Sequence, residues 1–260
     1  MGLETARLMG KDHYLIICGR TEKKLEKALE ELKDEGMEAE CFVCDVSDRV
    51  AVHRLAVRAA QAGKVTAVIH AAGMSPHMGD ARRIMEANAL GTIFVNEEFY
   101  EVMEEGSCIV NVASMAGYLL PKFLMPGRSY GLSLTDKAAF LRKMMSRVGM
   151  LPRKYHSDIA YGISKNFVIW YAAAEAGKFG QKGIRLLSVS PGNFETPMGD
   201  LEKEEASSYL RYCAVKRFGE PKEIAGLLAF AAGPVPGYLT GVDILVDGGC
   251  VAGRHGGKVS

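Results

Sequence analysis

The stretch MGLETARLMGKDHYLIICGR, residues 1–20, decides the fold. Its apolar pattern predicts a helix over Leu3–Lys11 and then a buried strand over Tyr14–Cys18, which runs directly into Gly19 and Arg20. A helix that leads into a buried strand is the second half of a βαβ unit. The stretch therefore predicts a parallel sheet, and it raises the question of where the strand before this helix lies.

The rest of the chain alternates short apolar runs with longer periodic segments. The further predicted strands are Ala39–Val43, Ala67–His70, Cys108–Val112, Ile184–Ser190 and Val242–Val246. The further predicted helices are Glu22–Glu35, Asp48–Gln61, Arg82–Glu104, Tyr161–Phe179 and Pro221–Ala231. This alternation predicts one α/β domain over residues 1–260, a doubly wound parallel sheet of the Rossmann type. Ligands of such sheets bind beyond the carboxyl ends of the strands.

The composition argues against several classes of function. A net charge of +1 gives no reason to expect nucleic acid or a membrane as a partner. The six cysteines are scattered, which is typical of reduced thiols in a cytoplasmic protein, and the C-x-x-C of Cys41 and Cys44 has no second ligand pair. No metal is therefore expected. The apolar runs are too short to cross a bilayer, so we expect a soluble, cytoplasmic protein.

The motif YGISK, residues 161–165, places Tyr161 and Lys165 on one face of a predicted helix. A phenol has a pKa of about 10, which makes it a weak acid at neutral pH. An ammonium group about 5 Å away, at an effective dielectric constant near 20, favours the phenolate by about 3 kcal/mol. The pair could therefore transfer protons. A surface tyrosine beside a solvated lysine is the alternative at this point.

Further polar and glycine-containing motifs stand along the chain in a fixed order. They are CDVSD (44–48), HAAG (70–73), NALGT (88–92), NVASMAG (111–117), SVSPGNFETPM (188–198) and LTGVDILVDGG (239–249). With these motifs, the chain resembles the short-chain dehydrogenase/reductase family over nearly its whole length. The resemblance implies an NAD(P)(H)-dependent oxidoreductase that interconverts a secondary alcohol and a ketone, and that forms a homo-oligomer. The alternative is a non-catalytic dinucleotide-binding sensor or scaffold derived from such an enzyme.

The resemblance also implies roles for individual residues. Tyr161 would be the acid and base, and Lys165 would lower its pKa and bind the nicotinamide ribose. Ser114 would hold the substrate oxygen, and Asn88 would anchor a water that relays protons. The implied cofactor-binding residues are Gly2, Arg20, Asp45, Val46, Ala72, Gly73, Tyr161, Lys165, Pro191, Gly192, Phe194 and Thr196. His70 departs from the family's commoner asparagine, and we interpret it as a buried histidine.

The residue after the first predicted strand bears on the cofactor. In this family an acidic residue at the end of the second strand, which corresponds to this place, bonds the adenosine ribose hydroxyls. Here Gly19 is followed by Arg20, with Lys23 and Lys24 further on. A guanidinium group can bind a 2′-phosphate with two hydrogen bonds. We therefore expect NADP(H) to be favoured over NAD(H); the alternative is that Arg20 only caps the loop.

The family begins with a strand and a glycine-rich turn, which places the pyrophosphate at the N-terminus of the next helix. Gly2 matches the last glycine of that turn, and the earlier part has no counterpart here. We therefore expect that the first strand is missing from this chain. We also expect that Met1 is an internal methionine of a protein that starts about a dozen residues earlier. By itself, the 260-residue form is expected to bind pyrophosphate poorly and to have impaired activity.

An insertion separates Ser114 from Tyr161: 46 residues lie between them, in place of about a dozen in most relatives. We interpret residues 118–158 as a lid-like helical segment, with an amphipathic helix over 133–150 whose N-cap is Ser133. The predicted apolar stripe is Leu134, Ala138, Leu141, Met145 and Val148. The alternatives are a solvated surface excursion and an oligomer contact. Residues 253–260 are predicted to be a flexible tail.

The insertion also suggests a substrate class. Its eight lysines and arginines outnumber two aspartates, so a lid could attract an acidic group while its apolar stripe covers a hydrophobic body. An insertion at this place also resembles bacterial 3α-hydroxysteroid dehydrogenase/carbonyl reductases of the same family. We therefore predict a bulky hydrophobic alcohol or ketone, such as a hydroxysteroid, as the small-molecule substrate.

Overall fold

The computed structural model describes residues 1–196 and 203–254, and its strands and helices lie close to the predicted ones. The strands are β1 Leu15–Gly19, β2 Ala39–Val43, β3 Ala67–His70, β4 Cys108–Val112, β5 Arg185–Pro191 and β6 Asp243–Val246. The longer helices are α1 Gly2–Met9, α2 Glu22–Asp34, α3 Arg49–Ala62, α5 Gly91–Val102, α7 Lys137–Val148, α8 His156–Gly180 and α10 Pro221–Ala232. The shorter ones are α4 Ala81–Met85, α6 Ala116–Leu119, α9 Lys203–Tyr209 and α11 Cys250–Arg254.

All strand pairs in the described residues are parallel, as the alternation of strands and helices predicts. β3, β4, β5 and β6 follow one another in one part of the sheet, and β1 pairs with β2 in the other. β5 is buried along its whole length, and β4 is buried except for Val112. Continuous apolar runs suit these strands because helices cover both of their faces. The predicted α/β fold of the Rossmann type is confirmed.

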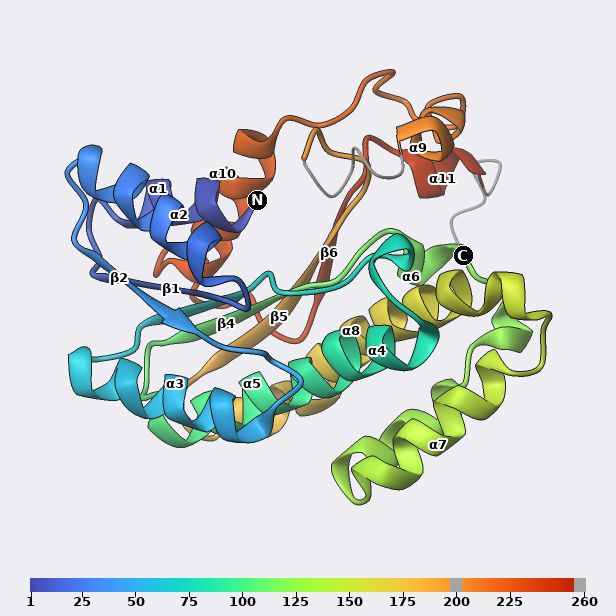
Figure 1. Ribbon diagram of the computed structural model, residues 1–260, viewed down its shortest axis with the longest axis horizontal. Helices are drawn as coiled ribbons and strands as arrows, with labels where there is room; N and C mark the ends of the chain where they lie inside the picture. Colours follow the sequence, from blue (N-terminus) through green and yellow to red (C-terminus); the bar gives the residue numbers. More distant parts are fainter. Residues whose placement is uncertain (197–202, 255–260) are drawn as a thin grey trace.

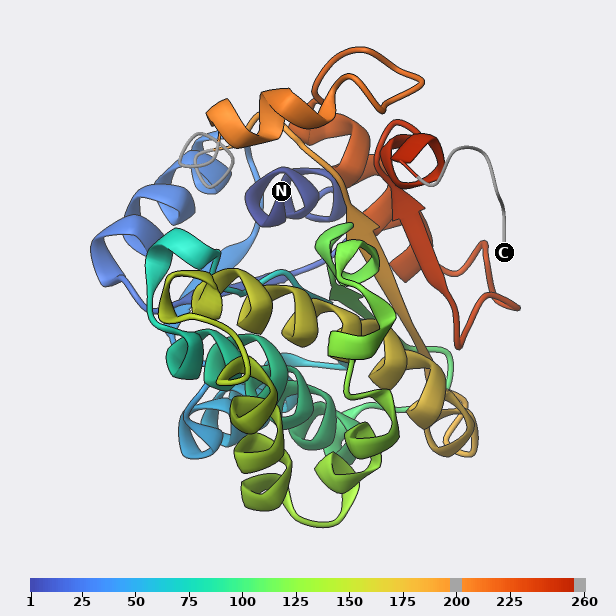
Figure 2. The ribbon, with the colours of Figure 1, turned by 90° about the vertical axis from the view of Figure 1, so that its right-hand side faces the viewer.

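Helices form a layer on each face of the sheet (Figure 1). On one face, α10 packs against β3 and β4, and α1 packs against α10. On the other face, α8 packs against β5, and α3 packs against α5. The view from the right-hand side shows α7 on the outer side of α8, away from the strands (Figure 2). The two faces therefore have separate hydrophobic clusters, and α8 has a third on its outer side.

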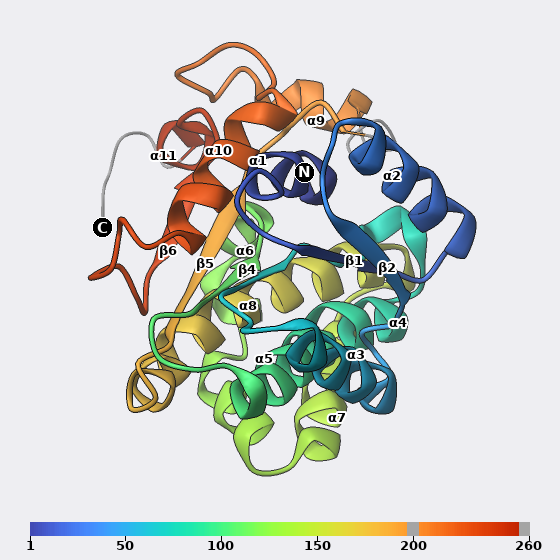
Figure 3. The same cartoon turned by 90° about the vertical axis from the view of Figure 1, so that its left-hand side faces the viewer.

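The sheet is in two parts, because no strand of the described residues lies between β1 and β3. Figure 3 shows the β1–β2 pair next to the part that contains β4, β5 and β6. A cavity of about 660 Å³ is lined by residues of both β1 and β3. This is the place that the expected first strand would occupy. The expectation that the protein begins before Met1 stays a prediction.

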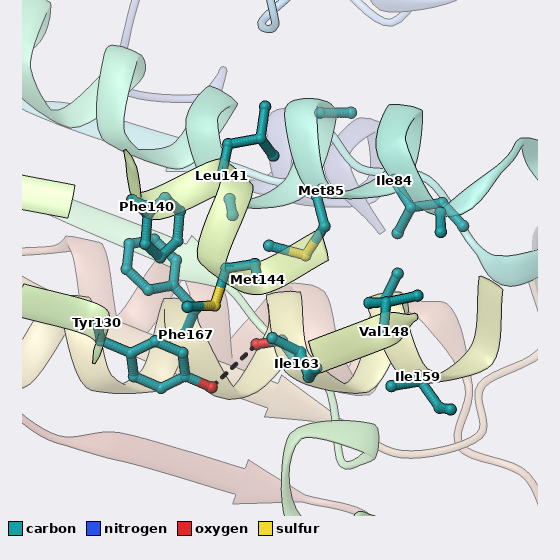
Figure 4. Close-up of a cluster of buried hydrophobic side chains, with 14 of the residues drawn as sticks. Ile84, Met85, Tyr130, Phe140, Leu141, Met144, Val148, Ile159, Ile163 and Phe167 are labelled. Atoms are coloured by element: carbon teal, nitrogen blue, oxygen red, sulfur yellow. Dashed lines mark hydrogen bonds between the residues drawn. The ribbon is translucent and has the colours of Figure 1, made fainter. Parts of the chain in front are cut away.

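The insertion is helical, and α7 contributes to the core. Phe140, Leu141, Met144 and Val148 are buried against α4 and α8, together with Phe167 (Figure 4). The predicted stripe is wrong at Leu134, which is 42% exposed, and at Ala138, which is also exposed. Leu141 and Val148 are buried as predicted, and Met145 is half-buried against the same cluster. Phe140 and Met144, which the predicted stripe does not include, are buried in the core. The N-cap is Asp136, whose carboxylate accepts a hydrogen bond from the amide of Ala139, and not Ser133.

Other predicted boundaries are wrong as well. α8 begins at His156 and not at Tyr161, so it starts within the predicted insertion. The helix predicted over Arg82–Glu104 is divided into α4, a π-helical turn over Glu86–Leu90, and α5. Gly253 and Arg254 belong to α11 and not to a flexible tail; the rest of that predicted tail lies outside the described residues. Among the residues that the structure describes, no helix is both long and apolar enough to span a membrane.

Arg185, at the start of β5, stabilises the end of α10. Its side chain is 9% exposed, and its guanidinium group donates to backbone carbonyls that follow the last turn of the helix or form part of it. These acceptors are the carbonyl oxygens of Ala231, Ala232, Gly233 and Leu239, at 2.8, 3.3, 2.5 and 3.3 Å. Such carbonyls have no partner within the helix itself. Arg185 therefore connects the sheet to the C-terminus of α10.

We expect Arg185→Met to lower the free energy of unfolding by about 2–4 kcal/mol, because buried carbonyls would lose their donors. Arg82→Met is the matched control, since Arg82 makes an exposed ion pair with Glu86 one turn away and should cost less than about 1 kcal/mol. Urea denaturation measures both. Equal losses in the two variants would contradict the capping role.

Candidate active site

Three of the four predicted catalytic side chains line one cavity of about 440 Å³. Ser114 follows β4, whereas Tyr161 and Lys165 are one turn apart on α8. The ammonium nitrogen of Lys165 lies 5.8 Å from the centre of the Tyr161 ring. The cavity also contains six of the predicted cofactor-binding residues that have no catalytic role: Gly2, Gly73, Pro191, Gly192, Phe194 and Thr196.

Lys165 is buried, with only 7% of its surface exposed. Its Nζ donates a hydrogen bond of 2.9 Å to the carbonyl oxygen of Val112, at the end of β4. Burial lowers the pKa of Lys165 to about 8, because an ammonium group loses hydration in the protein interior. His70 is buried as well. Its own burial and, to a smaller extent, the charge of Lys165 lower the pKa of His70 to about 3, so His70 is neutral at physiological pH. This is the buried histidine that we predicted.

Ser114 is held where β4 leads into α6. Its Oγ accepts a hydrogen bond of 3.2 Å from the amide of Ala116, which leaves its hydroxyl hydrogen able to point to an oxygen in the cavity. The position suits its predicted role, because the carboxyl ends of parallel strands are where ligands bind in such folds.

Two glycines allow α6 to lie against α8. A Cβ atom on Gly117 would lie 2.9 Å from the amide nitrogen of Asn166, and one on Gly162 would lie 2.6 Å from Leu120. Neither distance is compatible with a normal contact, so a side chain at either position would push the two helices apart. Asn166 also donates a hydrogen bond of 2.9 Å to the carbonyl oxygen of Gly117. This close approach fixes the distance between Ser114 and Tyr161.

Asn88 does not line the cavity and lies behind it, in the π-helical turn. Its Nδ2 donates to the Met74 carbonyl at 2.9 Å and to Ser164 Oγ at 3.1 Å, and its Oδ1 accepts from the Met74 amide at 2.8 Å. Ser164 Oγ in turn donates to the Tyr161 carbonyl at 2.7 Å. Asn88 therefore ties the segment after Gly73 to the turn of α8 that carries Tyr161. Its predicted role in holding a water stays a prediction.

The residues predicted for the adenosine end lie outside this cavity. Val46 and Ala72 line the neighbouring cavity of about 660 Å³, and Arg20 is exposed after β1. Burial acts to raise the pKa of Asp45, but two hydrogen bonds from Ser47 and the charge of Arg20 hold it below its usual range. The Asp45 carboxylate is thus ionised and already bound to Ser47.

Several lining residues suit a dinucleotide. The N-terminus of α1 lies at the cavity, where Gly2 is part of the lining, and helix N-termini attract phosphate groups. Gly192 also lines the cavity, and a Cβ atom there would lie 2.6 Å from the Cα of Asp247. Lys165 and Thr196 add polar side chains to the lining. The expectation that the 260-residue form binds pyrophosphate poorly stays a prediction.

Sequence reasoning missed the residues that make the cavity apolar. They come from the segment after Gly73, from the end of α6, and from the region of α9 and the loop after it: Met74, Leu119, Leu120, Tyr209 and Phe218. Leu119 and Leu120 could have been found, since they follow Ser114 closely. Tyr209 and Phe218 stand in a region without a motif. α7, which we predicted as a lid, contributes no lining residue.

Within residues 1–196 and 203–254, no cluster of histidine, cysteine, aspartate or glutamate side chains is arranged to hold a metal ion.

Comparison with known proteins places the chain in a family. Residues 1–127 match the family model described as short chain dehydrogenase, and residues 144–251 match the one described as Enoyl-(Acyl carrier protein) reductase. The chain is 30% identical to the short-chain dehydrogenase/reductase bsc3 of Alternaria brassicicola, over 97% of this chain and 92% of the relative. The chain belongs to the short-chain dehydrogenase/reductase family. It is thus an oxidoreductase that acts on CH–OH groups with NAD(P).

Other relatives show the range of substrates in the family. Galactitol 2-dehydrogenase (L-tagatose-forming) of Cereibacter sphaeroides is 26% identical over 96% of this chain and 90% of its own. The 7alpha-hydroxysteroid dehydrogenase of Bacteroides fragilis is 40% identical, but over only 34% of this chain and 35% of its own. A short chain dehydrogenase from Burkholderia cenocepacia in complex with NADP has the same fold, with a TM-score of 0.76, 20% identity and coverage of 96% and 92%.

The burial of Lys165 predicts a pH dependence of stability. The folded protein binds this proton less tightly than the unfolded chain, because the pKa falls from 10.5 to about 8. The unfolded state then binds more protons between these values, so stability should rise with pH by about 3 kcal/mol from pH 8 to pH 10.5. Lys165→Met should remove this rise and should be more stable than the parent at pH 7. Urea denaturation of both proteins across this range tests it, and parallel pH profiles would contradict it.

Proposed function

We propose that this oxidoreductase interconverts a bulky, hydrophobic secondary alcohol and its ketone, with NADP(H) as the favoured cofactor. The observation that carries the proposal is the convergence of Ser114, Tyr161 and Lys165 on one cavity with a largely apolar remainder. The activity class is that of the family; the substrate class, the cofactor preference and the residue roles are the parts that we propose.

Tyr161 is the proton donor and acceptor of this proposal. When a ketone is reduced, the phenol of Tyr161 gives its proton to the carbonyl oxygen. A nicotinamide held beside Tyr161 and Lys165 would supply the hydride for the carbonyl carbon. In the oxidation of an alcohol, Tyr161 takes the hydroxyl proton back. Lys165, held by the Val112 carbonyl, stabilises the phenolate that remains after the proton has left. Ser114 donates a hydrogen bond to the same substrate oxygen and so fixes its place.

The lining of the cavity favours a hydrophobic substrate body. Leu119 and Leu120 stand on the α6 side, and Tyr209 and Phe218 on the α9 side. A polyol such as galactitol would leave many of its hydroxyl groups without partners against these side chains, which is costly. A hydroxysteroid or another fused-ring ketone buries apolar surface instead. The partial match to a 7alpha-hydroxysteroid dehydrogenase supports the same choice.

The charged side chains that line the cavity bear on the charge of the substrate. The basic side chains of the insertion do not line it. Among the lining residues that the structure describes, Lys165 is the only lysine or arginine, whereas Asp158 and Glu195 are both present. The expectation that the insertion attracts an acidic group thus has no support from this geometry. We therefore propose that the substrate is neutral. The insertion acts through Leu119 and Leu120 and through the core contacts of α7. The homo-oligomer stays a prediction.

We expect Tyr161→Phe to reduce kcat for ketone reduction by about a thousandfold or more, because phenylalanine has no proton to give. NADPH binding should change by less than about threefold, because the phenol is small compared with the cofactor contact. Turnover is followed by NADPH absorbance with a panel of steroid, fused-ring and polyol substrates, and binding by NADPH fluorescence. Tyr118→Phe is the matched control. Full activity in Tyr161→Phe would refute the assigned role.

Arg20 supports the preference for NADP(H). It is exposed at the end of β1, and its charge reaches Asp45 at the adenosine end of the predicted cofactor site. We expect Arg20→Glu to lower the ratio of kcat/KM for NADPH to that for NADH by about a hundredfold, since a carboxylate repels a 2′-phosphate. Lys23→Glu, an exposed charge reversal nearby, should change the ratio only a few-fold. Equal effects of both variants would contradict a direct contact.

A further inference from the structure

The basic side chains of α7 have no role in the reaction proposed above. The inner side of this helix is buried, since Phe140 and Met144 pack into the cluster beside α8. Arg142 and Lys143 lie on the opposite side and are exposed, and Arg147 lies half-buried at the border between the two sides. In Figure 1, α7 lies at the edge of the molecule, separated from the sheet by α8. Its outer side therefore faces solvent.

This positive charge continues into the turn after the helix and is not neutralised. Arg153 and Lys154 follow in a 3-10 turn and are exposed. The sequence over 137–157 contains no aspartate or glutamate. Within the part of the chain that the structure describes, none of the five cations named so far forms an ion pair, whereas Lys137 pairs with Glu97 at 2.8 Å. The net charge of +1 gave no reason to expect a membrane partner, but it averages over this local excess.

Two large apolar side chains are exposed among these cations. Met150 is 62% exposed, and Tyr155 is 46% exposed. Nη1 of Arg147 lies 3.6 Å from the sulfur of Met150, and Nζ of Lys154 lies 4.8 Å from the centre of the Tyr155 ring. Each exposed apolar group thus has a cation beside it. Together the seven side chains form the basic face: Arg142, Lys143, Arg147, Met150, Arg153, Lys154 and Tyr155.

We propose that the basic face docks on the surface of a lipid bilayer that contains anionic headgroups. A lysine or arginine close to such a surface strengthens binding about fivefold, and the basic face has five of them. Met150 and Tyr155 enter the boundary between headgroups and acyl chains, where apolar and aromatic side chains are stabilised. The contact is peripheral and reversible, and salt weakens it because the cations stay close to water.

A bilayer suits the basic face better than a nucleic acid does. The phosphates of a nucleic acid would also pair with the cations, since such contacts supply most of its affinity for proteins. They would leave the exposed side chain of Met150 without an apolar partner. A bilayer offers anionic headgroups and an apolar phase within a few ångströms of each other, which matches the alternation of cations and apolar groups on this face.

The test measures binding of the full protein to lipid vesicles by co-sedimentation. One set of vesicles contains phosphatidylcholine alone, and the other contains phosphatidylcholine with about one third phosphatidylserine. We expect binding to be at least about tenfold stronger with phosphatidylserine, and to be lost in about 1 M salt, where the Debye length is about 3 Å. Absence of binding to both kinds of vesicle would overturn the proposal, as would binding that neither phosphatidylserine nor salt changes.

Charge reversal locates the docking surface. The double variant Arg142→Glu, Lys143→Glu should bind the anionic vesicles about thirtyfold more weakly or worse, because two attractive charges become repulsive. Its matched control is Lys23→Glu, Lys24→Glu on α2, which changes the total charge equally and should bind within about threefold of the parent. All four side chains are exposed, so both variants should keep the fold. Equal losses in the two variants would contradict docking through the basic face.

The apolar part of the contact separates a bilayer from a nucleic acid. Met150→Ser leaves the charge unchanged and should weaken vesicle binding about threefold, because less apolar surface enters the bilayer. Duplex DNA is the competitor at the same salt concentration. Tighter binding to DNA than to the anionic vesicles, or no effect of Met150→Ser on vesicle binding, would overturn the proposal. None of these readouts depends on turnover, so failure of the proposed function would not affect them.

Discussion

The burial of α8 between the sheet and α7 is the constraint on which the active site depends. One side of this 25-residue helix packs against β5, and its other side carries Ile163 and Phe167 into the cluster that α7 completes. Tyr130 of the insertion donates a 2.9 Å hydrogen bond to Asn166 of α8, and Asn166 donates to the carbonyl oxygen of Gly117. These hydrogen bonds connect the insertion, α8 and α6. With α8 held on both sides, Tyr161 and Lys165 have one position relative to Ser114.

The chemistry follows from this placement and not from the residue types alone. Lys165 loses its proton more easily than an exposed lysine because it is buried next to the end of β4, and the Val112 carbonyl there is its hydrogen-bond acceptor. The neutral His70 beside it adds no second charge. Asn88 contributes without touching the cavity, since it orients the turn of Tyr161 through Ser164. A tyrosine and a lysine at the same spacing on a solvated helix would lack every one of these supports.

Much of this architecture could be predicted from the sequence, because strand and helix periods are local properties. β2, β3 and β4 have the predicted bounds, and YGISK indicates the shared face of Tyr161 and Lys165. Contacts between distant segments could not be predicted. The pairing of Asn88 with Met74 converts a predicted continuous helix into a π-helical turn, and the packing of Phe140 on Phe167 rotates α7 away from its predicted stripe. Tyr209 and Phe218 are distant in sequence from the catalytic motifs, and only the folding of the chain brings them to the cavity.

The division of the sheet also has a consequence for cooperativity. β1 and β2 pair only with each other in the described chain, whereas β4 and β5 each have two neighbouring strands. In a protein of these 260 residues, heat should thus melt the β1–β2 region before the strands that carry Ser114 and support α8. Arg20 belongs to this region of lower stability. A dinucleotide whose adenosine half binds Arg20 must also keep the β1–β2 region folded, and the free energy needed for this lowers its affinity. Recognition of that half and thermal fraying of the sheet are therefore linked in this protein.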